Sequence, residues 1–352
     1  MTIYWLLLVY VIAVGRIVPH FAFKDKKRTI VFLCILAIVF LQGLRAYTVG
    51  IDLRNYIPAF LMSDRWNLVS GFRYQNYEFG FSLLLHSLRK MGFNETGLLF
   101  FISGTIHLLI GYIIYRYSKM PVISFVVYIC MGIFAFTFSG LRQSIAISIL
   151  FFSYEYIKNR ELIPYLLCIG LSMSMHASAI VFLPAYWLFN IRIRRVGFIA
   201  IILATIGIFA YRRPLYVLIY SLYKGGYPLV KDTGAYEMLL LMILIYMSSY
   251  LFDVKSNRAG NVDVDLNAYR NFMLIAVIIQ IFTSQSDVIG RAGYYYFIYA
   301  CLLIPEFVNK LSGKQRFVVV SALVLFLFFF FWWTTLRTGS MSVVPYSFYW
   351  QK

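Results

Sequence analysis

Arginines, carboxylates and one histidine suited to a phosphorylated substrate occur in five short stretches of the chain. Arginine binds phosphate through two parallel hydrogen bonds, whereas lysine acts as a point charge. A carboxylate or an imidazole can take the proton of an attacking hydroxyl. These residue types predict group transfer on an anionic substrate. The stretches hold Arg45, Asp52, Arg54 and Tyr56, then Glu78, then Arg142 and Gln143, then His176, and last Arg291 and Tyr295.

Three side chains are candidates for the base. Asp52 lies in the polar stretch 45–77, Glu78 directly follows it, and His176 interrupts an apolar run. An ionisable group at membrane depth is a functional candidate by default, although a lone histidine is often a packing residue. Asp52 could instead form an ordinary loop ion pair with Arg45 or Arg54. The choice among the three stays open, with Glu78 ranked narrowly first.

Two arginines follow glycines at predicted helix ends. Arg142 comes two residues after Gly140, in the first turn of a predicted helix, where a cation opposes the helix dipole. A bound diphosphate would compensate that charge, and an arginine reaching for a lipid phosphate is the alternative. Arg291 stands between Gly290 and Gly293, and the tyrosines that follow suit either an aromatic belt or stacking on a sugar.

The elements that must position these residues are membrane helices. Hydrophobic residues make up 61% of the 352 residues and charged residues only 13%, which excludes a soluble globular domain. We therefore expect an all-α, polytopic membrane protein with a single transmembrane domain, 1–352. An outer loop, 45–96, carries an interfacial or re-entrant helix at about 78–91. About twelve helices are predicted, two of them short: 3–22, 29–46, 97–115, 121–138, 142–157, 162–175, 177–189, 197–211, 235–252, 271–286, 292–308 and 317–336.

The basic residues orient these helices. With Lys24–Arg28 in the cytoplasm, every predicted inner loop carries at least two cations, and both termini lie outside. The net charge of +18 then reflects inner loops and lipid contacts rather than a nucleic-acid surface. The outer cations are mostly arginine and include Arg45, Arg142 and Arg291. That excess predicts an anionic ligand, plausibly a lipid-linked phosphate, approached from outside.

Motifs for several other functions do not occur in the sequence. It contains no P-loop, GxGxxG, HExxH or GxSxG pattern, and no predicted inner loop could hold a nucleotide-binding domain. Its four cysteines sit in apolar runs without a CxxC pair. We expect neither a cofactor nor a metal, because a set of arginines can neutralise a leaving diphosphate.

In this order and spacing, the motifs resemble the EpsG family of Wzy-like polysaccharide polymerases. The resemblance covers nearly the whole chain, and it implies a GT-C-like fold. One residue departs from the pattern, since Phe79 stands where the family often has proline. The matching motifs are Arg45-x-x-x-Val49-Gly50-x-Asp52 with Tyr56, Glu78-x-Gly80, Ser139-Gly140-x-Arg142-Gln143, His176-x-Ser178 and Arg291-x-x-x-Tyr295.

The resemblance implies assembly of exopolysaccharide, capsule or O-antigen on the outer face of the bacterial inner membrane. The donor would be a growing glycan on polyprenyl diphosphate such as undecaprenyl diphosphate, and the acceptor a sugar hydroxyl of the incoming lipid-linked unit. Membrane lipid, a chain-length regulator and a flippase are candidate partners, and nucleic acid is not. A glycan ligase of similar chemistry and a lipid-linked oligosaccharide flippase or transporter are the alternatives.

Each candidate residue has an expected role in that reaction. The diphosphate is expected on Arg45, Arg142 and Arg291. The base is expected among Glu78, Asp52 and His176. The remaining substrate contacts are expected from Arg54, Tyr56, Gln143 and Tyr295.

Overall fold

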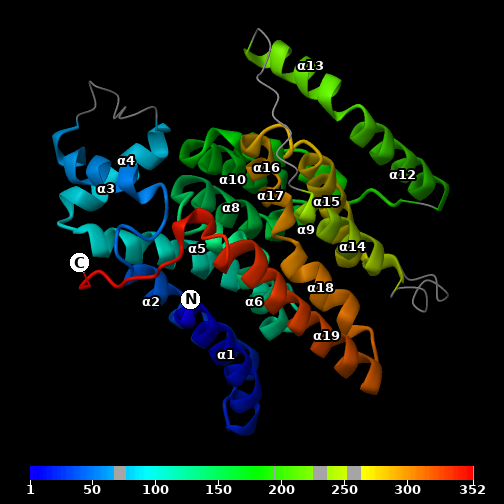
Figure 1. The fold of residues 1–352 in the computed structure, drawn as a ribbon, viewed down its shortest axis with the longest axis horizontal. Coiled ribbons are helices and arrows are strands. Elements are labelled where there is room, and N and C mark those ends of the chain that lie inside the picture. The colour runs from blue at the N-terminus through cyan, green and yellow to red at the C-terminus, as the bar shows by residue number, and fades with distance from the viewer. Residues whose placement is uncertain (67–76, 194, 225–235, 252–262, 352) are drawn as a thin grey trace.

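The protein is described by a computed structural model that covers residues 1–66, 77–193, 195–224, 236–251 and 263–351. Within these ranges the fold is all-α, as predicted, apart from an isolated β-bridge between Arg45 and Phe348. Figure 1 shows a crowded central bundle from which α1 and the α12–α13 pair project. Several predicted outer or inner cations, Arg73, Lys231, Lys255 and Arg258 among them, lie outside the described residues.

In chain order the α-helices are α1 (Thr2–Ile17), α2 (Lys26–Gly43), α3 (Leu53–Met62), α4 (Phe79–Lys90), α5 (Glu95–Tyr117), α6 (Pro121–Cys130), α7 (Ile133–Phe136), α8 (Leu141–Phe152), α9 (Tyr154–Lys158), α10 (Leu162–Met175), α11 (Ala185–Leu188), α12 (Arg195–Ala210), α13 (Arg212–Lys224), α14 (Glu237–Leu251), α15 (Val264–Gln280), α16 (Asp287–Ala292), α17 (Tyr294–Phe297), α18 (Ala300–Asn309) and α19 (Gly313–Phe331). Short 3-10 turns are η1 (Val18–His20), η2 (Ser63–Arg65), η3 (Ala177–Phe182) and η6 (Ser340–Ser342), and η5 (Trp332–Leu336) is a π-helical turn.

The apolar helices make this an integral membrane protein, but they do not reproduce the twelve predicted helices. In the described part of the chain, 3 helices are long and apolar enough to cross a membrane, or up to 5 if each bent pair counts as one. The long helices are Thr2–His20, Glu95–Tyr117 and Gly313–Leu336. The bent pairs are Ala200–Ala210 with Arg212–Ser221, at 74°, and Val288–Phe297 with Ala300–Asn309, at 41°.

Several predicted spans are shorter because the backbone breaks inside an apolar run. The predicted span 121–138 divides into α6 and α7 at Gly132, whose φ of 83° is left-handed and favours glycine. The predicted span 142–157 divides into α8 and α9 at Ser153, whose hydroxyl donates to the Leu150 carbonyl. Hydropathy alone does not reveal the break at Gly132, because the residues on both sides of it are apolar.

Other predicted elements are confirmed. Helix α4 matches the short helix expected at 78–91, and α10 ends at Met175, so the chain does break at His176. The second short helix, 177–189, is instead the 3-10 turn η3 followed by α11. The sequence prediction missed α3 inside the outer loop and α13, which bends away from α12.

Helix α8 is the buried centre of the region that holds the candidate site. Its side chains are buried almost all round, as expected of a helix enclosed by others. Ser144, Ala146 and Ser148 are small, which allows neighbouring helices to approach closely. Helices α5 and α10 both pack against α8, and α2 packs against α5.

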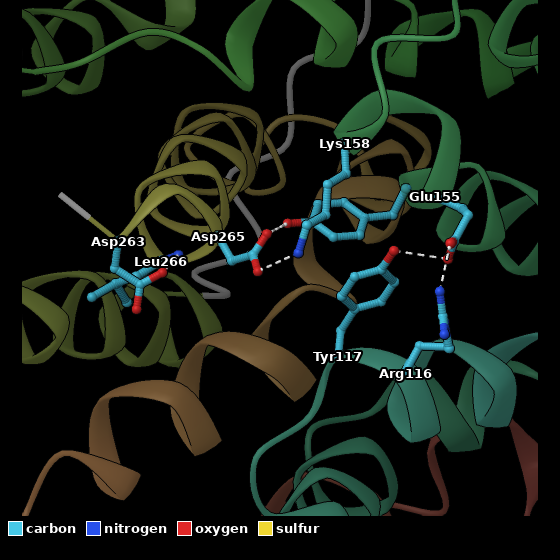
Figure 2. A network of polar contacts seen from close by, with 8 residues as sticks. Arg116, Tyr117, Glu155, Lys158, Asp263, Asp265 and Leu266 are labelled. Carbon is cyan, nitrogen blue, oxygen red and sulfur yellow. Dashed lines mark hydrogen bonds and ion pairs between the residues drawn. The ribbon is translucent and has the colours of Figure 1, made fainter. Parts of the chain in front are cut away.

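A polar network joins α5, α9 and α15 at one end of the bundle, as Figure 2 shows. Lys158 lies 2.6 Å from a carboxylate oxygen of Asp265. Glu155 accepts a 2.8 Å hydrogen bond from the Tyr117 hydroxyl and lies 3.2 Å from Arg116. The ends of α5, α9 and α15 therefore lie together. The basic residues of the sequence predict that all three lie on the cytoplasmic side.

The opposite end of the bundle carries both ends of the chain. The Tyr4 hydroxyl of α1 donates a 2.7 Å hydrogen bond to the Val343 carbonyl. The Ala46 N–H, directly after α2, donates to the Ser347 carbonyl at 2.9 Å. The two termini therefore share one end, which is called the site end below. The assignment of this end to the outside of the cell stays a prediction.

Candidate functional site

A cavity of about 350 Å³ opens at the site end among residues that are far apart in the sequence. Segments at the starts of α3, α8, η3 and α16 meet there. Six residues singled out from the sequence line it: Asp52, Tyr56, Arg142, Gln143, His176 and Arg291. The other lining residues are Asn55, Tyr77, Phe136, Gly140, Ser178 and Val288.

Arg142, in the first turn of α8, forms an ion pair with Glu78, the residue that precedes α4. The guanidinium Nη1 lies 2.5 Å from Oε2 of Glu78, and Nε donates to the Tyr56 hydroxyl at 3.4 Å. The guanidinium also lies over the Tyr77 ring, 4.7 Å from its centroid. Glu78 is thus the anion that compensates Arg142 in this structure, and diphosphate binding by Arg142 stays a prediction.

Glu78 is held by three groups at once. Its Oε1 accepts a 2.9 Å hydrogen bond from the Ala177 N–H. The same oxygen lies 3.1 Å from Nδ1 of His176, although the ring is poorly aligned for a hydrogen bond. Burial alone raises the pKa of Glu78, but His176, the Ala177 N–H and Arg142 outweigh it and lower that pKa to about 2. A carboxylate so stabilised is a weak base.

His176 occupies the break between α10 and η3. Its backbone is extended, with φ −156° and ψ 116°, and its N–H donates to the Ser172 carbonyl at 2.8 Å. The side chain lines the cavity and is 26% exposed. Because Nδ1 faces Glu78, Nε2 is the ring nitrogen left for a substrate. A carboxylate behind an imidazole is the arrangement that orients a general base.

Arg291 contributes a second cation to the cavity. The Gln143 side-chain amide, buried beside it, donates a 2.8 Å hydrogen bond to the Arg291 carbonyl and so joins α8 to α16. Within the described ranges, the Arg291 guanidinium has neither a hydrogen bond nor an ion pair. It is therefore free to bind an anion, whereas Arg142 already has a partner.

Tyr295 lies behind the cavity. Its hydroxyl is 3.0 Å from the Ser178 hydroxyl, and its side chain is fully buried. The contact joins α17 to η3 beside His176. This geometry suits a residue that positions the His176 segment, while the predicted contact with substrate stays a prediction.

Arg45 and Arg54 lie apart from the cavity. Arg45 is only 2% exposed, its Nη2 donates to the Phe138 carbonyl at 3.1 Å, and its guanidinium lies 4.8 Å from the centre of the Phe138 ring. Arg54 is exposed on α3. Neither is among the lining residues. The structure therefore places Arg45 beside the turn that precedes α8. Its contacts with Phe138 hold that turn, and the turn positions Arg142.

The C-terminal tail completes this support. The Met341 carbonyl accepts hydrogen bonds from the Ser139 hydroxyl, at 2.9 Å, and from the Ile51 N–H, at 3.2 Å. Much of the aromatic tail packs against the loop after α2 and the turn before α8, although Tyr349 and Trp350 remain exposed.

Four lining residues escaped the sequence prediction: Asn55, Tyr77, Phe136 and Val288. Asn55 follows Asp52 by three positions, one helical turn into α3, and Tyr77 directly precedes Glu78. Helical spacing was the signal for Asn55, but α3 itself was not predicted. Within the described residues, no group of three or more histidines, cysteines or carboxylates could hold a metal ion.

Comparisons with known proteins give one match. Neither the curated proteins nor the solved structures searched contain a protein similar to this chain, so the GT-C-like architecture stays a prediction. The model of the EpsG family matches residues 4–348. That match spans every segment of the cavity. The chain therefore belongs to the EpsG family.

Proposed function

We propose that this protein polymerises lipid-linked oligosaccharide repeat units on the outer face of the bacterial inner membrane. Family membership indicates a Wzy-like polymerase of polysaccharide biosynthesis, which implies lipid-linked sugars as substrates. The observation that carries the finer proposal is the cavity at the site end, where Arg142, Arg291 and His176 meet. Its two cations suit a diphosphate, and its imidazole suits a sugar hydroxyl.

The reaction is transfer of the growing glycan to an incoming unit. A hydroxyl oxygen of the acceptor sugar attacks the anomeric carbon of the donor. The bond between that carbon and the diphosphate oxygen breaks, and the polyprenyl diphosphate leaves with the electron pair. The hydroxyl proton passes to a base. Negative charge develops on the leaving diphosphate, so stabilising it is the main task of the protein.

We assign the base to His176 and not to Glu78 or Asp52. The low pKa of Glu78 makes its carboxylate a poor proton acceptor at neutral pH. Its contact with Nδ1 suits it to orient the ring and to stabilise the imidazolium. Asp52 lines the cavity without such an arrangement behind it, and we place it near the acceptor sugar.

We assign the leaving diphosphate to Arg291 first and Arg142 second. Arg291 is an unpaired cation in the described part of the cavity, so binding an anion breaks no existing ion pair. Arg142 can add a hydrogen bond through a donor that Glu78 does not use, because a guanidinium carries five N–H groups. Together they supply the charge that a metal ion supplies in other enzymes.

The decisive experiment gives purified protein a lipid-linked repeat unit in detergent. A polymerase produces a ladder of longer lipid-linked glycans. A glycan ligase moves the glycan to a different acceptor, and a flippase forms no new bond. Arg291→Ala should abolish the ladder. Lys90→Ala should not, because Lys90 is an exposed cation at the C-terminal end of α4 that does not line the cavity. Absence of a ladder with wild-type protein would refute the proposal.

A further inference from the structure

A second cavity, of about 380 Å³, runs along α8 directly below the candidate site. Helix α8 forms its floor, α5 and α10 form its walls, and Leu84 of α4 lies at one end. This cavity is called the α8 groove. Its lining includes Ile145, Ile149 and Phe152 of α8 and Leu171 and Met175 of α10.

The α8 groove is apolar throughout. Among the residues that the structure describes, no charged side chain lines it, and only Thr105 and Cys168 bring a hydroxyl or a thiol to its surface. The Thr105 hydroxyl already donates to the Phe101 carbonyl of its own helix at 2.9 Å. A polar solute would lose its hydration there without gaining a partner, whereas a hydrocarbon chain would not.

Helical spacing makes the groove continuous with the cavity above it. Ile145, Ile149 and Phe152 follow Arg142 by three, seven and ten positions, so all four share one face of α8. On α10, Met175 lines the groove and the next residue, His176, lines the cavity. The groove therefore adjoins the part of the cavity that Arg142 and His176 line.

The length and opening of the groove suit one leaflet of a membrane. Ten residues of α-helix separate Arg142 from Phe152, a rise of about 15 Å, which is half of a hydrocarbon core about 30 Å thick. Leu171 and Phe101 at its edge are 51% and 40% exposed. A chain with its charged head at the site end could therefore enter sideways from the lipid.

We propose that the α8 groove binds the polyprenyl chain of the donor whose diphosphate lies at Arg142 and Arg291. The inference rests on the proposed function. The larger cavity among α1, α6 and α19, lined by Arg16, Val122 and Val324 among others, does not share a lining residue with the site that holds Arg142 and Arg291, and it serves as the control.

The test is photo-cross-linking with a polyprenyl diphosphate that carries a diazirine on its chain. Wild-type protein in detergent should be labelled on α5, α8 or α10, and unlabelled polyprenyl diphosphate should compete. Thr105→Trp and Cys168→Trp, which fill the groove from two helices, should each lower labelling at least about fivefold, while Val324→Trp should not. Elution as a single species shows that each variant is folded.

The outcomes separate this inference from the proposed function. Labelling outside α5, α8 and α10, or equal competition by phosphatidylglycerol, would overturn the assignment of the groove. In the polymerisation assay, groove-filling variants should raise the KM for a polyprenyl donor about tenfold and leave a donor with a two-isoprene tail unchanged. An equal loss with both donors would also overturn it. Specific labelling without any wild-type product would refute the proposed function alone.

Discussion

Replacing Glu78 with glutamine separates the proposed base from the group that orients it. Because its pKa is about 2, Glu78 stays ionised throughout the working range of an assay and adds no step to a pH–rate profile above pH about 4. With His176 as the base and Glu78 behind it, we expect His176→Asn to abolish activity and Glu78→Gln only to weaken it.

The distance between the two groups sets the size of the effect. Nδ1 of His176 lies 3.1 Å from Oε1 of Glu78. Even with the dielectric constant of water, opposite unit charges at that distance attract by about 1.3 kcal/mol, which is roughly a factor of ten in rate. Glu78→Gln removes the anion nearest the imidazolium that forms as the proton is taken, so kcat/KM should fall about tenfold.

The assay is release of lipid diphosphate by purified protein at neutral pH. Asp64→Asn, which changes an exposed carboxylate in η2, is the matched control and should leave the rate unchanged. Full activity of His176→Asn, or equal rates for Glu78→Gln and wild type, would refute the assignment of His176.

Four further predictions concern the arginines, acid stability, a turn and metal dependence. Arg142→Ala and Arg291→Ala should each lower polymer synthesis by at least about 10²-fold, but only Arg142→Ala should lower the melting temperature, because it leaves Glu78 unpaired; equal melting temperatures would contradict this. The pKa of Glu78 is lowered on folding, so its carboxylate stabilises the fold above pH about 4.5 and loses this effect as the pH falls toward 2. Acid melting curves should therefore show wild type losing its advantage over Glu78→Gln below pH about 4.5, and parallel curves would argue against the ion pair. Gly50→Ala puts a Cβ 2.2 Å from the Phe138 carbonyl oxygen at a φ of 114°. It should lower the free energy of unfolding by at least about 1 kcal/mol and weaken polymer synthesis. An unchanged melting temperature would show that the turn accommodates the methyl group without strain. EDTA should leave full activity, and restoration of lost activity by a divalent cation would contradict the arginine mechanism.

Sequence patterns found the residues of the cavity better than they found the helices around it. Glycine turns and polar breaks in apolar runs are local signals, so Arg142, His176 and Arg291 could be recognised and all three line the cavity. The same logic found α4 and the end of α10. It failed for α3, whose ten residues include Pro58 and lie in a polar loop.

The burial of Arg45 is an example of a feature that could not be predicted from the local sequence. Its position after an apolar run resembles that of a phosphate ligand, but the tail residue Phe348 and the Phe138 carbonyl enclose it. Those partners come from distant parts of the chain, so no local pattern predicts the burial. The ion pair between Glu78 and Arg142 is likewise a tertiary contact, and with the low pKa of Glu78 it is the reason that we propose Glu78 as a positioning residue and His176 as the base.

The most direct measurement of the central claim counts lipid diphosphate released against glycosidic bonds formed. Purified protein receives a repeat unit labelled separately in its glycan and its lipid, and both products are quantified in one reaction. The account predicts one polyprenyl diphosphate for each new bond, and neither product with Arg291→Ala. Bond formation without release of lipid diphosphate, or release without bond formation, would contradict it.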